Sequence, residues 1–390
     1  MTDDISIFLN PSEAIRGLDK FNLSGTLADC IEIYDGSEFP DLKEYSVAIV
    51  GMQESRGDDS NVACSEGVEP IREALFKLYM DRPSIKIIDL GNILPGHTLS
   101  DSQFALESVC QYLIDHNTVP VVIGGAQHLT YGMYRAFAHL ERMMNLAVVD
   151  ATFDIGEAED ELNSKNFLSK IILDDPNYLF NYSNIGYQTY LVNPEIRGML
   201  EKMNFDLHRL GAVRGKIDQM EPVLRGADML SFDLSSIRKS DFPAHEEAQI
   251  NGLSAEDACQ LSLYAGMSDK ISMVGFFGYN PMLDDLSQSA HLIGQMIWHF
   301  IDGFRARKSD NFLYDKSRFT KYLVPIEKDH EIVFYKSKQT DRWWMEVPYP
   351  TSPDNRFQRK ELIPCSYVDY EEASKGEVPD RWVLTFNKLS

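Results

Sequence analysis

Oxygen-bearing side chains gather in three short segments, each at the end of an apolar run. The segments are Gly124-Gly125-Ala126-Gln127-His128, Asp150-Ala151-Thr152-Phe153-Asp154 and Ser231-Phe232-Asp233-Leu234-Ser235. In open parallel sheets, functional groups sit just beyond the carboxyl ends of the strands. Carboxylate oxygens are the ligands that hard cations such as Mg²⁺ and Ca²⁺ prefer. These three strand ends are therefore where we expect the chemistry of the chain.

Buried strands must carry these segments. Continuous apolar runs, rather than alternating ones, indicate parallel strands that are covered on both faces. We predict six of them: Val47-Ala48-Ile49-Val50-Gly51, Ile85-Lys86-Ile87-Ile88-Asp89, Pro120-Val121-Val122-Ile123-Gly124, Leu146-Ala147-Val148-Val149-Asp150, Met229-Leu230-Ser231-Phe232-Asp233 and Ile271-Ser272-Met273-Val274-Gly275.

Helices are predicted between these strands. After Ser100, apolar residues recur at helical spacing, and Ser100 with Gln103 resembles a capping box. A second helix carries Ile293 to Ile301 on one face, and Gly303 is placed to end it. Alternating strands and helices predict a three-layer α/β/α fold with a mainly parallel central sheet.

The character of the sequence changes after about residue 310. Residues 331–335 and 343–347 flank a polar stretch and predict an antiparallel β-hairpin. We expect the pair Trp343-Trp344 to lie on alternating faces of this hairpin, with one face packed on the main domain or on a neighbouring subunit. The predicted division is a domain over residues 1–310, with an N-terminal arm over 1–44, and a C-terminal extension over 311–390.

Composition excludes several classes of function. The formal net charge is −23, which argues against nucleic acid and against an anionic membrane surface as partners. The five cysteines form no CxxC pair, so a zinc ribbon is excluded and free thiols are expected. No apolar run could span a bilayer, and the acidic start Met1-Thr2-Asp3-Asp4 is unlike a signal peptide. We expect a cytoplasmic protein.

The three strand-end segments, in this order, resemble the GGDHS, DAHxD and SxDxD motifs of the arginase superfamily, the ureohydrolases, which include arginase, agmatinase and formimidoylglutamase. The resemblance covers roughly residues 45 to 305 and implies the arginase-like form of the three-layer fold. Other similar segments are Gly67-Val68-Glu69-Pro70-Ile71-Arg72, Asp89-Leu90-Gly91-Asn92, Tyr264-Ala265-Gly266-Met267-Ser268 and Tyr279-Asn280-Pro281, with Asn184-Ile185-Gly186-Tyr187-Gln188 resembling the formimidoylglutamase branch.

The resemblance implies a centre of two divalent metals, usually manganese, held by four aspartates and two histidines. Together the metals generate a hydroxide that attacks a guanidinium or amidine carbon. Three of the aspartates are matched by Asp150, Asp154 and Asp233. The remaining three ligand positions are occupied by Gln127 and Thr152, in place of the histidines, and by Ser235, in place of the fourth aspartate.

Other positions of the family also differ. The acidic residue of the E-x-N-P segment falls on Gly278, and the aspartate of GGDHS falls on Ala126. His128 lies one place beyond the histidine position, so its side chain is expected on the other face, as a packed histidine. Neutral amides and hydroxyls are weak substitutes for imidazole as ligands of manganese-like ions.

If the fold is kept, Asp150, Asp154 and Asp233 converge in one cleft and repel one another. A hard ion, an internal cation or a cationic ligand would relieve the repulsion. The candidate internal cations are Arg238, which we favour, and also Arg135 and Lys165. In a further interpretation, Asp150 and Asp233 merely cap their strands.

We therefore expect a ureohydrolase-fold protein with a degraded binuclear site, which binds a small cationic or amidine-like ligand or acts as a regulator. No cofactor is expected; the alternative is Mn or Mg at Asp150, Asp154 and Asp233. The alternative function is a formimidoylglutamase-like hydrolase of linear amidine or guanidino C–N bonds with an altered metal centre. A third interpretation is a structural oligomer whose cleft is vestigial. By analogy with the family, we expect a homo-oligomer.

Overall fold

The structure is a computed structural model that describes residues 5–14, 24–81, 84–157, 159–310, 316–327, 330–349 and 360–389. The N-terminal segment Met1-Thr2-Asp3-Asp4 lies outside these residues, as does the predicted division at residue 311. No helix in the described ranges is long and apolar enough to cross a membrane.

A ten-stranded sheet forms the centre of the main domain in the described part of the chain, with strand order β1-β4-β3-β5-β10-β9-β6-β7-β8 and β2 beside β4. Its neighbouring strands are parallel, except that β1 runs antiparallel to β4. The strands are β1 (Leu9–Asn10), β2 (Glu32–Ile33), β3 (Val47–Met52), β4 (Ile87–Ile93), β5 (Val119–Ile123), β6 (Met144–Val149), β7 (Leu179–Tyr187), β8 (Asp206–Arg209), β9 (Met229–Asp233) and β10 (Met273–Phe277).

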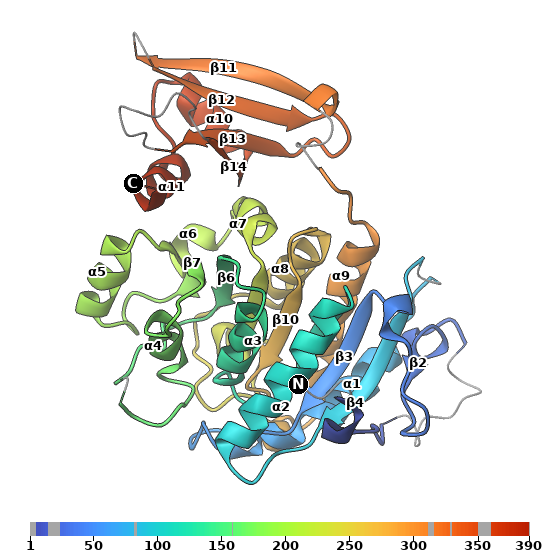
Figure 1. Ribbon diagram of the computed structural model, residues 1–390. Coiled ribbons are helices and arrows are strands. Elements are labelled where there is room, and N and C mark those ends of the chain that lie inside the picture. Colours follow the sequence, from blue (N-terminus) through green and yellow to red (C-terminus); the bar gives the residue numbers. More distant parts are fainter. Residues whose placement is uncertain are drawn as a thin grey trace.

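Helices cover both faces of this sheet, as the continuous apolar runs predict (Figure 1). Within β3, Val47 and Ile49 belong to one hydrophobic core, whereas Ala48 and Val50 belong to the other. The helices are α1 (Val68–Phe76), α2 (Leu99–Asp115), α3 (Leu129–Ala138), α4 (Phe167–Ile172), α5 (Pro194–Lys202), α6 (Leu210–Val213), α7 (Glu221–Gly226), α8 (Ala255–Met267) and α9 (Gln288–Arg305). The predicted three-layer fold is confirmed.

Two predicted helix ends were wrong. Thr98 and Asp101, not Ser100 and Gln103, form the capping box of α2. Gly303 lies inside α9, which continues to Arg305. A Cβ atom on Gly303 would lie 2.4 Å from the carbonyl oxygen of Leu263 in α8, so this glycine permits close helix packing and does not end the helix.

The C-terminal extension is an antiparallel four-stranded sheet in the described residues, with order β11-β12-β13-β14. The predicted hairpin is confirmed, because β12 pairs with β13. The elements are β11 (Phe319–Glu327), β12 (His330–Ser337), β13 (Trp343–Pro348), β14 (Lys360–Cys365), α10 (Tyr367–Ser374) and α11 (Asp380–Leu389).

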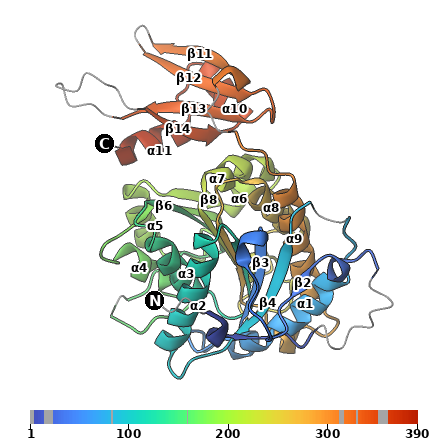
Figure 2. The same cartoon turned by 45° about the vertical axis from the view of Figure 1, so that its right-hand side comes forward.

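The extension lies beyond one end of the main domain, close to α7, in both views (Figure 1, Figure 2). Trp343 packs into the extension's own core. The guanidinium of Arg225, in α7, lies over the ring of the next residue, Trp344, 4.4 Å from the ring centroid. The two tryptophans thus face opposite sides of the hairpin, and one of them packs on the main domain, as expected.

Candidate functional site

Three aspartates meet at the carboxyl ends of adjacent strands. Asp150 directly follows β6, Asp233 is the last residue of β9, and these two strands are neighbours in the sheet. One carboxylate oxygen each from Asp150, Asp154 and Asp233 lies within 4.8 Å of the others, and all three residues are buried. The predicted convergence of the three carboxylates is confirmed.

A tight loop after β6 brings Asp154 back toward Asp150. Asp154 has a positive φ of 48°, a left-handed conformation that is uncommon for a residue with a side chain. The loop is tied to β7, where Asn184 Nδ2 donates a hydrogen bond of 2.8 Å to the carbonyl oxygen of Thr152. The backbone of this loop therefore holds the two carboxylates together.

Thr152 binds both carboxylates of this loop. Its backbone N–H donates to Asp150 Oδ1 at 2.8 Å. Its hydroxyl oxygen lies 3.2 Å from Asp150 Oδ1 and 2.9 Å from Asp154 Oδ1. A hydroxyl has one proton, so it donates to one carboxylate at a time. Thr152 therefore bridges Asp150 and Asp154 through hydrogen bonds.

Asp233 is held mainly by its own backbone turn. Its Oδ1 accepts a hydrogen bond of 2.6 Å from the N–H of Ser235, and its carbonyl oxygen accepts one of 2.5 Å from Ser236 Oγ. Ser235 is buried near the cleft and lines its cavity. Ser235, at the position that resembles the family's fourth aspartate, thus supports Asp233 through its backbone N–H.

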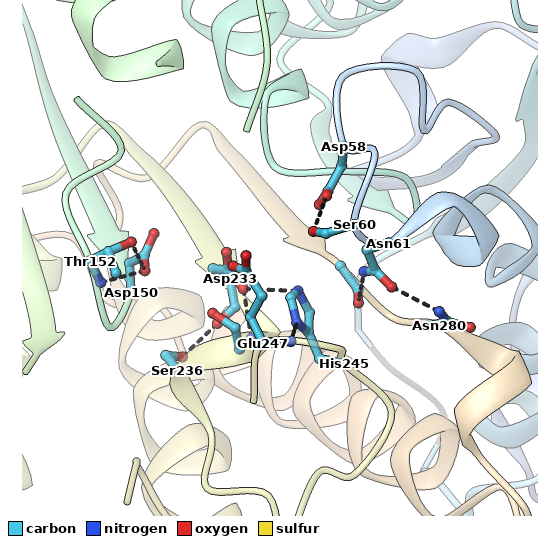
Figure 3. Close-up of polar contacts among 12 residues, drawn as sticks. Asp58, Ser60, Asn61, Asp150, Thr152, Asp233, Ser236, His245, Glu247 and Asn280 are labelled. Atoms are coloured by element: carbon cyan, nitrogen blue, oxygen red, sulfur yellow. Dashed lines mark hydrogen bonds and ion pairs between the residues drawn. The ribbon is translucent and has the colours of Figure 1, made fainter. Parts of the chain in front are cut away.

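His245 also reaches this cluster, and the sequence analysis did not single it out. Its Nε2 lies 3.8 Å from Asp233 Oδ1, as the dashed line in Figure 3 marks. Its Nδ1 accepts a hydrogen bond of 3.0 Å from the N–H of Glu247, so in the neutral ring the proton is on Nε2. His245 therefore points an N–H, rather than a lone pair, toward Asp233.

Burial governs the electrostatics of the three carboxyl groups. It raises the pKa of Asp150 well above the ordinary value, and the neighbouring Asp154 adds to this rise. It also raises the pKa of Asp154 to about 6. Burial, followed by Asp150, raises the pKa of Asp233 to about 6, against the opposing influence of His245. The cluster therefore favours a bound proton or a nearby cation.

The nearby cation is Lys165, not Arg238. Burial works to lower the pKa of Lys165, but Asp154, Glu247 and Asp233 hold it above its ordinary value. Lys165 also forms an ion pair with Glu247. Arg238 pairs instead with Asp241, 2.8 Å away and only three residues along the same loop, while Arg135 pairs with Asp174.

Gln127 and His128 lie at the carboxyl end of β5. Gln127 lowers the pKa of Asp150, although neither of its amide atoms has a hydrogen-bond partner among the described residues. His128 is fully buried, and burial lowers its pKa to about 4. A Cβ atom on Gly57 would lie 2.4 Å from His128 Nδ1, so a loop packs directly on this ring. The expectation of a packed histidine is confirmed.

A cavity of about 500 Å³ opens beside the carboxylates. Its size is that of a site for a small ligand. Its polar wall includes the carboxylates of Asp154 and Glu247 and the hydroxyls of Thr152 and Ser235, which could hold a cation or a cationic group. The cavity is lined by Ala151, Thr152, Phe153, Asp154, Ile155, Lys165, Leu191, Val192, Asn193, Ile196, Ser235, Glu247 and Gln249.

Known proteins with related sequences include formimidoylglutamases. One from Staphylococcus aureus is 24% identical over 266 residues, which span 65% of this chain and 85% of that protein. One from Geobacillus is 31% identical over 173 residues, 42% of this chain and about half (51%) of that protein.

The fold is shared with solved structures as well. The crystal structure of formimidoylglutamase from Bacillus subtilis aligns with a TM-score of 0.66 at 18% identity, covering 76% of this chain and 97% of that one. The family model described as "Arginase family" matches residues 45–302. This chain therefore belongs to the arginase family.

Proposed function

We propose that the cleft binds a small cationic, amidine-like ligand and does not hydrolyse C–N bonds through a pair of manganese ions. One observation carries the proposal. Thr152 stands where the family has a metal-binding histidine, and its hydroxyl contacts Asp150 and Asp154, two carboxylates that would otherwise face an ion. A hydrogen-bond donor occupies the place of a metal ligand.

The donor set supports the same conclusion. Two divalent ions would draw on the six family positions, of which three hold aspartates and three hold Gln127, Thr152 and Ser235. Imidazole nitrogens give such centres their affinity for manganese-like ions, and none of these six side chains is an imidazole. His245 does not replace one, because its Nε2 carries the proton when Nδ1 accepts from Glu247. The set does not fit a manganese pair.

A cationic ligand would offset the repulsion among the carboxylates of the cleft. Asp150 Oδ2 and Asp154 Oδ2 are buried and have no hydrogen-bond partner among the described residues. Amidinium and guanidinium groups are planar, carry a delocalised charge and bind carboxylates through two parallel hydrogen bonds. The apolar side chains of the cavity, such as Leu191 and Ile196, would cover the remainder of such a ligand.

A second candidate is a formimidoylglutamase-like hydrolase with an altered, single-ion centre. Three carboxylate oxygens within 4.8 Å of one another suit one hard cation, and the related sequences carry the name formimidoylglutamase. Asp150, Asp154 and Asp233 would hold the ion, which would supply Lewis-acid activation of water. The amide of Gln127, buried without a partner, would be a further oxygen donor.

Metal analysis, binding and turnover separate these candidates. We expect fewer than two manganese ions per purified chain, saturable binding of agmatine in calorimetry, and no urea or formamide from agmatine or formimidoylglutamate. Asp233→Asn should weaken agmatine binding about ten- to a hundredfold, as the loss of a charged hydrogen bond predicts. The matched control is Asp302→Asn, which changes a partly exposed carboxylate on α9 and should leave binding unchanged.

Two results would overturn the first candidate. Two manganese ions per chain, with product release that falls in Asp150→Asn, would restore the two-metal mechanism of the family. One ion per chain, with the same dependence on Asp150, would favour the second candidate. Assembly as a homo-oligomer stays a prediction that sedimentation of the full chain would test.

A further inference from the structure

A second cavity, of about 520 Å³, lies where the extension meets the main domain. Its walls include Asn145 at the start of β6, Asn181 in β7, and Lys270 just before β10, so it lies at the amino-terminal end of the sheet. The three aspartates lie at the opposite end of the strands. From the extension, Trp344 of β13 and Arg381 of α11 complete the walls.

Arg225 is the most deeply buried charge of this cavity. It is 2% exposed, and its Nη2 donates hydrogen bonds of 3.0 Å to the carbonyl oxygens of Trp343 and Cys365. Its Nε lies 3.1 Å from Glu221 Oε1. Its Nη1 has no hydrogen-bond partner among the described residues. One edge of a buried guanidinium is therefore left without an acceptor.

Further donors around the same cavity are also unsatisfied. Trp344 Nε1 and Arg381 Nε are buried and lack hydrogen-bond partners in the described part of the chain. The carboxylate nearest to Arg381 belongs to Asp369, 3.9 Å away. A buried polar group without a partner costs free energy and calls for an unseen water or ion. Here the unsatisfied groups of the three lining residues are all donors, so the missing partner is an acceptor.

The surrounding carboxylates do not supply that acceptor. Glu221 Oε1 is shared by two arginines, Arg225 at 3.1 Å and Arg342 at 3.2 Å, which leaves one positive charge in excess. Asp206 is engaged by Lys388, 3.6 Å away, and by Asn181 at 2.7 Å. Among the described residues that line the cavity, four are cations, Arg225, Lys270, Arg381 and Lys388, and three are carboxylates, Asp206, Asp269 and Glu361, so the walls carry one positive charge in excess.

We propose that this cavity binds a small organic anion, a carboxylate or a phosphate monoester, between Arg225, Arg381 and Trp344. The anionic group would accept hydrogen bonds from the unsatisfied donors, since guanidinium groups bind carboxylate and phosphate through paired hydrogen bonds. The apolar part of the ligand would lie against Phe180 and Pro364. Such a ligand would join the extension to the main domain, a role beyond the function proposed for the aspartate cleft.

Calorimetry on the full chain tests this site with four probes: benzoate, phenyl phosphate, inorganic phosphate and neutral benzyl alcohol. We expect one of the two aromatic anions to bind once per chain, benzyl alcohol not to bind, and inorganic phosphate to bind more weakly than phenyl phosphate. Which aromatic anion binds more tightly tells whether the natural ligand is a carboxylate or a phosphate. No binding of either aromatic anion at millimolar concentration would overturn the proposal.

Variants with small structural cost locate the site. Arg381→Gln should weaken binding about ten- to a hundredfold, and Trp344→Phe, which keeps the ring over Arg225 but removes the N–H, should weaken it up to about tenfold. The matched control Arg305→Gln lies on α9, where Arg305 pairs with Asp302, and should bind as the wild type does. Asp233→Asn should also bind normally. Binding that resists both Arg381→Gln and Trp344→Phe, or that is lost in Asp233→Asn, would refute this location.

Discussion

Nε2 of His245 lies 3.8 Å from Oδ1 of Asp233, in space that opens because residue 278 is a glycine. An ideal Cβ atom on Gly278 would lie 2.7 Å from Nε2 of the same ring. The resemblance to the family motif places an acidic residue at this position, whereas in this chain the imidazole N–H of His245 lies beside Asp233. A side chain at residue 278 and the ring of His245 would therefore compete for the same space.

The first prediction concerns this shared space. Gly278→Ala should destabilise the protein by more than about 1 kcal/mol, because its φ of 92° disfavours any side chain and because the new methyl group meets His245. In the background of His245→Ala, the cost should fall toward the backbone contribution alone. Denaturant titrations of the two single variants and the double variant would measure a coupling of roughly 0.5 to 3 kcal/mol. Strictly additive effects would show that the ring and residue 278 do not compete.

The second prediction concerns repulsion among the carboxylates. The folded-state pKa of Asp154 is raised to about 6, so the folded state binds a proton at this carboxyl more tightly than the unfolded state does. The resulting stabilisation is complete below the ordinary pKa of an aspartate and is lost as pH rises through 6. With chelator present, Asp154→Asn should therefore increase the free energy of unfolding at pH 8 by roughly 1 to 3 kcal/mol. Unfolding titrations at pH 8 and pH 4.5 would show this gain shrinking in acid. A variant less stable than the wild type at pH 8 would contradict the prediction.

The third prediction concerns His128, whose effect on the pH dependence of stability is opposite in sign to that of Asp154. Burial lowers its folded-state pKa to about 4, so the stability it contributes is present above pH 6.5 and is lost as pH falls from 6.5 toward 4. On acidification, the free energy of unfolding of the His128→Gln variant should therefore fall by roughly 2 to 3 kcal/mol less than that of the wild type. Unfolding free energies measured from pH 7 to pH 4 would test it, with the exposed His97→Gln as control. Parallel pH profiles for wild type and His128→Gln would show that the ring does not titrate on unfolding.

The fourth prediction concerns the extension. Removing residues 311–390 deprives Arg225 of its acceptors at Trp343 and Cys365 and uncovers α7. We expect a loss of about 3 kcal/mol or more, or a change of oligomeric state, because each hydrogen bond to a charged group contributes about 1.5 to 3 kcal/mol. Thermal unfolding and the mass in solution are the measurements. A truncated chain with an unchanged melting temperature and unchanged mass would show that the extension is an independent appendage.

The strands that the sequence predicted are those buried on both faces. β3, β5, β6, β9 and β10 are continuous apolar runs, and their ends were placed to within about two residues. In contrast, β7 carries Asn181 and Ser183, and it was not predicted as a strand. These side chains bind Asp206 of β8, so their polarity is satisfied by a partner distant in the sequence.

By itself, the sequence determined the layered α/β fold and the convergence of Asp150, Asp154 and Asp233. Periodicity and motif order carry this information because they are local along the chain. Only the tertiary structure decided that Lys165 and His245, rather than Arg238, compensate the carboxylates. This compensation depends on distances through space, which the sequence does not give. Arg238 forms an ion pair with Asp241, three residues along the chain, whereas His245 reaches Asp233 because a loop folds over Gly278.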